Sequence, residues 1–132
     1  PTRCILCWDK MQPWENFSQF ELAWTSFDSP AAIFKQSNTG GANKETKIHP
    51  TQKPVSLYAW CIKKYAKEGD KILDTHLGSG SSRIAAFKLG FDFYATEINE
   101  AYYRDEEKRF KEACLGQLET RDGKTVTQTS LF

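Results

Sequence analysis

Residues 71–99 read KILDTHLGSGSSRIAAFKLGFDFYATEIN, and this stretch decides the fold of the chain. It begins with a short apolar run over 71–75 and continues, after a Gly-Ser-Gly turn, with a helical pattern over 81–89. Gly90 ends that pattern, and a second apolar run follows over 91–96. The order predicts a strand, a tight loop, a helix and a strand, which form a parallel pair with its connecting helix.

The Gly-Ser-Gly turn is the expected ligand site. Gly78 and Gly80 flank Ser79, and their missing Cβ atoms let a ligand approach the backbone and let the turn adopt positive φ angles. The N–H groups at a helix start lack partners within the helix. A pocket is therefore expected beside this turn, at the carboxyl ends of the two strands.

The first third of the chain predicts strands rather than helices. Apolar, aromatic-rich runs lie at 3–8, 21–27 and 31–35, while Pro13 interrupts an irregular connection over 9–20. We expect the first run to be a strand buried on both faces. Together with the later elements, these runs predict the α/β class, with a mixed sheet and flanking helices.

Two further helices are expected outside the central stretch. Pro54 favours a helix start, and Asn99 is a suitable N-cap for a last helix. Helical spacing predicts one buried stripe on each: Leu57, Trp60, Cys61 and Tyr65 on the first, and Tyr103, Phe110 and Cys114 on the last.

Length and composition limit the possible classes of protein. The 132 residues suffice for one domain, expected over 1–115, with a flexible polar tail over 116–132. A net charge of +1 indicates no large basic field for nucleic acid, and no apolar run approaches the roughly 18 residues of a membrane span. We expect a cytoplasmic protein. Because an apolar run follows almost directly on Pro1, we also expect a fragment that enters its fold midway, although removal of an initiator Met before Pro would give the same start.

The cysteines favour neither a metal site nor disulfides. Cys4 and Cys7 have the C-x-x-C spacing of half a zinc site, but no second pair of Cys or His has matching spacing. Residues three apart on a strand also face opposite sides. Because most of the cysteines lie in apolar segments, we expect them to pack as small hydrophobic side chains, and no metal is predicted.

The charged residues around the turn favour S-adenosyl-L-methionine over a dinucleotide. A dinucleotide fold would have a third glycine where Arg83 stands. Asp74 ends the first strand, where it would repel a pyrophosphate but attract the ammonium and sulfonium of S-adenosyl-L-methionine. Glu97 ends the second strand, where an acid can accept hydrogen bonds from ribose hydroxyls, and Ile98 could lie against adenine. A solvated strand-end acid is the alternative for Glu97.

Three motifs together resemble one family. DTHLGSGSS at 74–82, ATEIN at 95–99 followed by AYY, and HPTQKP at 49–54 are similar to the amino-methylating DNA methyltransferases of the circularly permuted β class. The resemblance implies a partial Rossmann-like S-adenosylmethionine-dependent methyltransferase fold, with S-adenosyl-L-methionine as cofactor and double-stranded DNA as partner. It also implies a bacterial or phage protein, with restriction-modification as one possible role.

The resemblance assigns cofactor-binding residues by position. The loop that closes on the methionine end would be His49, Pro50, Thr51, Gln52, Lys53 and Pro54, with Thr51 and Lys53 binding the carboxylate. A stiff Pro-rich turn with a surface lysine is the alternative for this loop. Asp74 would face the amino group, Glu97 would hold the ribose with Ile98 beside it, and the methionine part would be wrapped by Gly78, Ser79, Gly80, Ser81 and Ser82. His76 stands where the family usually has Phe, so it counts among the cofactor residues and has no catalytic role.

The catalytic motif of these enzymes is absent from the sequence. They use Asp, Asn or Ser, then Pro-Pro, then an aromatic residue to hold and stack on the flipped base, whereas this chain contains no Pro-Pro. In the permuted order that motif would precede residue 1, so no catalytic residue is assigned and the chain alone is expected to be inactive. The whole enzyme would methylate the exocyclic amine of adenine, with cytosine as second choice, and would need no covalent nucleophile.

Two polar segments are expected to meet macromolecules. Residues 36–47 occupy the place of the target-reading segment, where phosphates or base edges could be contacted by Lys35, Asn38, Asn43, Lys44 and Lys47, although a solvated surface loop is the alternative. The final QTSLF resembles the peptide that docks on the bacterial sliding clamp, using Gln128, Leu131 and Phe132, although a frayed end is the alternative.

Two rival functions remain open. A nicotinamide-dependent dehydrogenase is disfavoured by Arg83, Asp74 and the HPTQKP motif. A non-catalytic DNA- or clamp-binding module would carry a degenerate cofactor pocket. Binding of S-adenosylhomocysteine and of NADH distinguishes all three possibilities.

Overall fold

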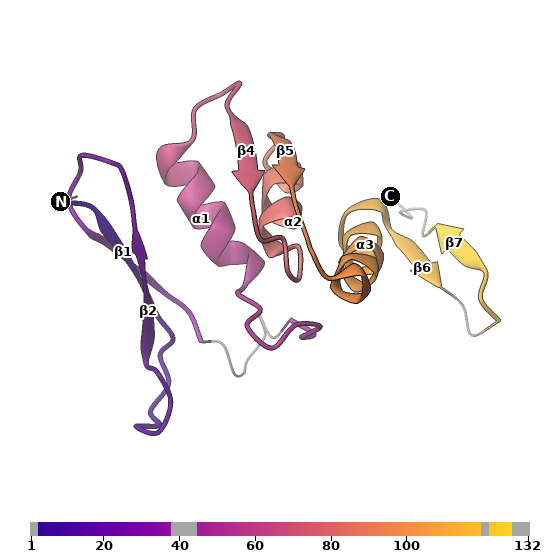
Figure 1. The fold of residues 1–132 in the computed structure, drawn as a ribbon, viewed down its shortest axis with the longest axis horizontal. Helices are drawn as coiled ribbons and strands as arrows, with labels where there is room; N and C mark the ends of the chain where they lie inside the picture. Colours follow the sequence, from indigo (N-terminus) through magenta and orange to yellow (C-terminus); the bar gives the residue numbers. More distant parts are fainter. Residues whose placement is uncertain (1–2, 38–44, 120–121, 128–132) are drawn as a thin grey trace, which may run out of the picture. The chain divides into compact units, whose positions relative to one another are not determined.

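The structure, a computed structural model, describes residues 3–37, 45–119 and 122–127. It divides the chain into two compact units, residues 1–46 and residues 47–132. Figure 1 follows the elements from β1 to β7 along the chain. In the described ranges, no helix combines the length and the apolar character that a membrane span requires.

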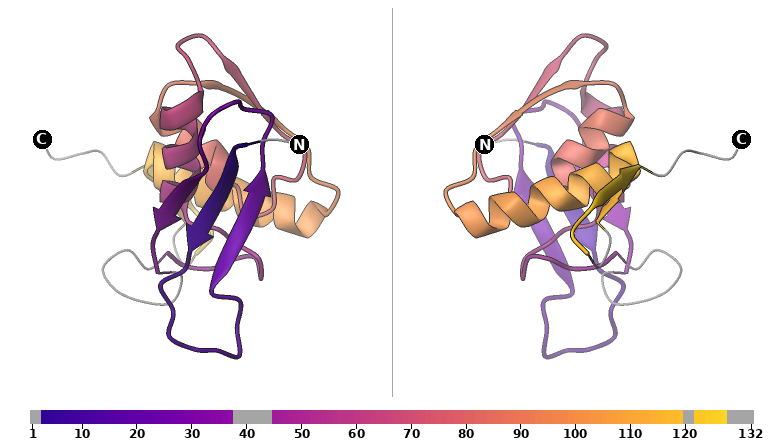
Figure 2. Two further views of the ribbon diagram at one scale, coloured as in Figure 1. Left: turned by 90° about the vertical axis from the view of Figure 1, so that its left-hand side faces the viewer. Right: turned by 90° about the vertical axis from the view of Figure 1, so that its right-hand side faces the viewer.

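The first unit is a three-stranded mixed sheet in the order β2-β1-β3. The central strand β1 (Ile5–Asp9) is antiparallel to β2 (Phe20–Trp24) and parallel to β3 (Ala32–Lys35), and Figure 2 shows the three side by side. The three predicted strands are thus confirmed. The prediction that β1 is buried on both faces is wrong, because its side chains alternate between a buried and a half-buried face.

The second unit contains the predicted strand, helix and strand. Its elements are α1 (Val55–Tyr65), β4 (Lys71–Asp74), α2 (Ser81–Lys88), β5 (Asp92–Ala95), α3 (Glu100–Leu115), β6 (Gln117–Glu119) and β7 (Thr125–Thr127). Strands β4 and β5 pair in parallel, with Ile72 opposite Phe93. The prediction from residues 71–99 is therefore confirmed, to within one residue at each boundary.

Both α1 and α2 cover one face of the β4–β5 pair. Ile62 of α1 packs with Ala85 and Ala86 of α2, and Ile72 and Phe93 of the two strands pack against this cluster. Because side chains alternate along a strand, the neighbouring Leu73 and Tyr94 point to the opposite face, where they are 68% and 56% exposed.

The buried stripe of α1 differs from the predicted one. Ile62 is the buried residue of this helix, and the partly buried apolar residues that join it in the cluster are Val55, Tyr58, Ala59 and Ala66. The predicted residues Leu57, Trp60, Cys61 and Tyr65 are all half-buried. Small alanines bring α1 close to α2, and a hydropathy pattern weighted towards large side chains misses that face.

The segment after α3 is partly ordered into a hairpin. Gly116 ends α3 in the left-handed conformation with φ of 62°, and β6 then pairs with β7 in antiparallel fashion. β-branched threonine and valine in β7 favour this pairing. The hairpin occupies part of the tail expected over 116–132, and both the flexibility of that tail and the domain boundary at residue 115 stay predictions.

Candidate functional site

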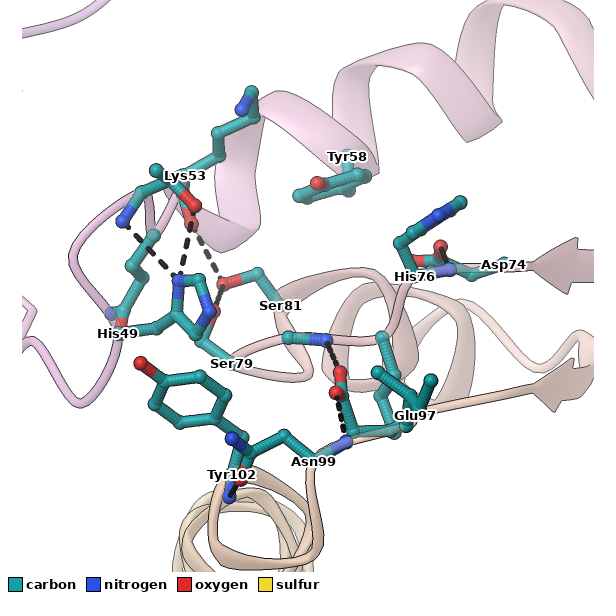
Figure 3. A pocket seen from close by; sticks show the side chains of 15 residues that line it. His49, Lys53, Tyr58, Asp74, His76, Ser79, Ser81, Glu97, Asn99 and Tyr102 are labelled. Atoms are coloured by element: carbon teal, nitrogen blue, oxygen red, sulfur yellow. Dashed lines mark hydrogen bonds between the residues drawn. The ribbon is translucent and has the colours of Figure 1, made fainter.

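A pocket with a volume of about 640 Å³ lies in the second unit, at the carboxyl ends of β4 and β5. The predicted cofactor residues that line it are His49, Thr51, Gln52, Lys53, Asp74, His76, Gly78, Ser79, Ser81, Glu97 and Ile98. Figure 3 shows His49 and Tyr102 on one side of this pocket and Asp74 and His76 on the other. The structure therefore brings the three motifs of the sequence together in one place.

The remaining predicted cofactor residues lie outside the lining. Pro50 is exposed within the 49–54 loop, and Pro54 is the buried N-cap residue of α1. Gly80 is the buried N-cap residue of α2, and Ser82 is buried in the first turn of that helix. These positions support the pocket wall rather than face the cavity.

Four lining residues were missed by the sequence analysis: Tyr58, Leu77, Asn99 and Tyr102. Asn99 ends the ATEIN motif, and Tyr102 belongs to the AYY sequence that follows it. Both lie close in sequence to Glu97, a predicted ligand residue, and this proximity could have indicated them. Tyr58 lies on the observed buried stripe of α1, and the sequence predicted a different stripe for this helix.

Glu97 ties the two loops at the strand ends together. Its Oε2 accepts a hydrogen bond from the Gly78 N–H at 2.8 Å, and its Oε1 accepts one from the Asn99 N–H at 2.8 Å. These bonds, the one from Asn99 first, hold the pKa of Glu97 below its ordinary value of 4.5. Since a carboxylate can accept about four hydrogen bonds, it retains capacity for a ligand hydroxyl.

Asp74 is oriented by the turn that follows it. Its Oδ1 accepts from the His76 N–H at 3.0 Å, and its Oδ2 accepts from the Ser82 hydroxyl at 2.5 Å. The carboxylate is thereby held at the pocket wall in a fixed orientation. Together with Glu97 it makes the strand-end side of the pocket negative, which favours a ligand with positive charge.

The 49–54 loop folds back on itself. The side chain of Gln52 is buried and its Oε1 accepts from the Ile48 N–H at 2.9 Å. The Thr51 N–H donates to His49 Nδ1 at 3.2 Å, and the His49 ring packs against Tyr102 with ring centroids 4.4 Å apart. The loop is therefore fixed by its own side chains and by the first turn of α3.

Gly80 is required where α2 begins. It is the N-cap of α2 in the left-handed conformation, with φ of 74°. The side chain of Glu106 lies against it and is fully buried, where it pairs with Arg83 at 2.9 Å. Burial raises the pKa of Glu106 although Arg83 favours the charged form. Arg83 thus occupies the expected third-glycine position because it joins α2 to α3.

Two of the predicted DNA-contact residues, Lys35 and Lys47, lie in the described part of the chain. Lys35 is exposed at the end of β3 in the first unit, and Lys47 is exposed at the start of the second. Asn38, Asn43 and Lys44 lie outside the described residues, as do the predicted clamp-binding residues Gln128, Leu131 and Phe132. The roles assigned to these residues therefore stay predictions.

The comparisons with known proteins agree on one family. The family model described as DNA methylase (N6_N4_Mtase) matches residues 8–108. The chain is 35% identical over 74 residues to Type II methyltransferase M.HpaI of Haemophilus parainfluenzae, and this covers 56% of the chain and 24% of that relative. It is 32% identical over 104 residues to Type II methyltransferase M2.DpnII of Streptococcus pneumoniae, which covers 79% of the chain and 35% of that relative.

A solved structure shows the same fold. The crystal structure of an M1.HpyAVI-SAM complex superposes with a TM-score of 0.61 at 22% identity, covering 80% of this chain and 60% of that one. The predicted methyltransferase-like α/β fold is thereby confirmed. The chain spans only 24% and 35% of the two curated relatives. On the match of the family model over 8–108, the chain belongs to the DNA methylase family.

Proposed function

We propose that this chain forms the S-adenosyl-L-methionine-binding part of a DNA methyltransferase of the circularly permuted β class. The whole enzyme would transfer a methyl group to the exocyclic amine of adenine, with cytosine as second choice. The observation that carries the proposal is the meeting of Asp74 and Glu97 beside the Gly-Ser-Gly turn in a pocket also lined by the 49–54 loop. Family membership and the Type II methyltransferase relatives support it.

The residues of the pocket fit this cofactor chemically. Asp74 is suited to the ammonium group, because its oriented carboxylate attracts positive charge. Glu97 is suited to the ribose, because each carboxylate oxygen accepts one backbone N–H and retains a further lone pair. Thr51 and Lys53 in the opposite wall would bind the carboxylate, and the exposed Ile98 would lie against adenine.

The acceptor side of the reaction needs residues of another type. When bound, the cofactor supplies an electrophilic methyl group, and the pocket residues described above would hold and orient the cofactor. Without the Pro-Pro-aromatic motif, the chain offers no side chain assigned to hold the flipped base. We therefore expect the chain alone to bind the cofactor without methylating DNA, whether it serves in restriction-modification or elsewhere.

The test is calorimetric titration of the full 132-residue chain with S-adenosylhomocysteine and with NADH. We expect binding of the first only, and an affinity at least about tenfold lower for Asp74→Asn, because the amide keeps the shape but loses the charge. Asp92→Asn, an exposed acid at the opposite end of β5, is the matched control. Binding of NADH alone would overturn the proposal, and binding of neither ligand would favour the degenerate module.

Sliding-clamp docking by the final residues is a separate part of the proposal. It rests on the QTSLF sequence alone, since those residues lie outside the described part of the structure. Deletion of residues 128–132 should abolish calorimetric binding to a bacterial sliding clamp. Unchanged binding would remove the idea without affecting the cofactor site.

A further inference from the structure

Arg109 reaches the pocket turn from outside the pocket. It lies on the third turn of α3 and is half-buried. Its Nη1 donates hydrogen bonds to the Ser79 carbonyl oxygen at 2.6 Å and to the Ser81 hydroxyl at 3.0 Å. One guanidinium nitrogen thus holds one atom of the Gly-Ser-Gly turn and one atom of the first residue of α2, both from residues that line the pocket.

The Ser81 hydroxyl passes this restraint to a second loop. It accepts from Arg109 and donates its own hydrogen to the Lys53 carbonyl oxygen at 2.7 Å. The three segments joined in this way are α3, the turn before α2 and the end of the 49–54 loop. Ser79 and Ser81 are 6% and 2% exposed, so water cannot readily replace these partners.

A second arginine in the same region has a different set of partners. Arg83 pairs with Glu106 and Glu107 of α3 and lies over the Phe110 ring, with its Cζ 3.8 Å from the centroid. It therefore joins helix to helix. Arg109 donates its hydrogen bonds from the same helix to residues that line the cavity, and both cations favour the charged form of Glu106.

We infer that Arg109 is a positioning residue for the pocket. It fixes the Ser79 carbonyl directly and the Lys53 carbonyl through the Ser81 hydroxyl, so that both loops keep the geometry in which a ligand is bound. This inference rests on the proposed function and deepens it. Arg109 does not line the cavity itself, so it would act on a bound ligand only through the residues that do. A guanidinium suits the role, since its charge is permanent and its planar donors have fixed directions.

The variants that test this role are Arg109→Met, Arg109→Lys and Ser81→Ala, with Arg104→Met as the matched control. Arg104 lies on the same helix, and its side chain is 73% exposed and pairs with Glu100. Two quantities are measured on each full chain: the dissociation constant for S-adenosylhomocysteine, and amide hydrogen exchange over residues 51–53 and 78–82.

Arg109→Met should weaken S-adenosylhomocysteine binding about tenfold or more, since it removes charge-assisted bonds to buried atoms. Arg109→Lys should restore part of the affinity, because it keeps the charge but not the planar donor. Exchange should become faster in both loops with Arg109→Met, and Arg104→Met should leave both quantities unchanged. The double variant with Ser81→Ala should be weakened by less than the product of the two single effects, because the residues act in one chain of bonds.

Unchanged exchange in both loops for Arg109→Met would overturn the inference, and so would fully multiplicative effects of Arg109→Met and Ser81→Ala. If Arg109→Met does not fold, the same comparison is made with Arg109→Lys and Ser81→Ala, which retain most of the contacts. The exchange measurement needs no ligand. A chain that fails to bind S-adenosylhomocysteine but loses loop protection with Arg109→Met would contradict the proposed function and still support the positioning role.

Discussion

Gly80 and Glu106 lie so close that no side chain fits between them. A Cβ atom on Gly80 would stand 2.3 Å from Cγ and 2.4 Å from Oε1 of Glu106. The N-cap residue of α2 and a buried carboxylate of α3 are therefore in close contact. This contact sets the distance between the pocket turn and α3, on which Arg109 stands.

Gly80→Ala is expected to destabilise the chain by about 3 kcal/mol, through the combined costs of a left-handed alanine and of overpacking. Gly90→Ala is the control, because Gly90 has a similar φ of 78° and no atom within 4 Å of an added Cβ. It should cost only about 1 kcal/mol. Urea denaturation of both variants measures the difference, and equal costs would mean that the contact with Glu106 is not limiting.

Glu97→Gln is expected to change how stability depends on pH. The pKa of Glu97 in the folded chain lies below 4.5, so its charged form is favoured by folding. The stabilisation is present above that pH and is lost as pH falls through the folded pKa. The wild type should therefore lose its advantage over Glu97→Gln as pH is lowered from 6 to 3.

Comparing the wild type with Glu97→Gln separates the contribution of Glu97 to the pH dependence of stability from that of Glu106. The raised pKa of Glu106 has the opposite sign, since its contribution is present at low pH and is lost as pH rises through the folded pKa. Because Glu106 is common to both chains, its effect cancels in the difference between their free energies of unfolding. A difference that stays constant from pH 6 to 3 would contradict the role of the two backbone bonds to Glu97.

Tyr102→Leu is expected to loosen the 49–54 loop, because it removes the ring that packs on His49. An aromatic pair of this kind contributes about 1 kcal/mol, so affinity for S-adenosylhomocysteine should fall about fivefold. Tyr103→Leu is the control, since Tyr103 is the next residue on α3 and is 47% exposed. Calorimetry of both variants decides, and equal losses of affinity would argue against the ring contact.

Ile62→Ala is expected to cost about 3 kcal/mol of unfolding free energy, because it opens a cavity against α2. Leu57→Ala should cost about 1 kcal/mol, because Leu57 is only half-buried. The two substitutions remove comparable side chains from the true and the expected stripe of α1. If chemical denaturation shows that Leu57→Ala costs more unfolding free energy than Ile62→Ala, the stripe predicted from the sequence is the buried one.

What could be predicted from the sequence depended on local signals. The elements of residues 71–99 follow from apolar runs and from glycines that stand where the chain must turn, such as Gly80 and Gly90. The Asn99 N-cap is confirmed as well, since its side chain accepts from the Tyr102 N–H at 3.1 Å. Motif spacing also placed most of the residues that line the pocket.

The failures were contacts that depend on tertiary packing. The α1 stripe is set by alanines that allow α2 to approach, and the stripe of α3 includes the buried Glu106, while the expected Tyr103 is 47% exposed. A carboxylate is not predicted inside a helix interface unless its partner Arg83 is known. The bonds of Arg109 likewise had no signal in the sequence, because they depend on where α3 packs.

The bonds that build the pocket join residues far apart in the chain. Gly78 and Glu97 are 19 positions apart, Lys53 and Ser81 are 28 apart, and Ser79 and Arg109 are 30 apart. Each of these links closes a loop of that length, which costs conformational entropy that a contact between near neighbours does not. During synthesis, the ribosome would release α1, β4 and the turn well before α3. The ligand site would therefore be completed only when the part of the chain that carries Arg109 has emerged.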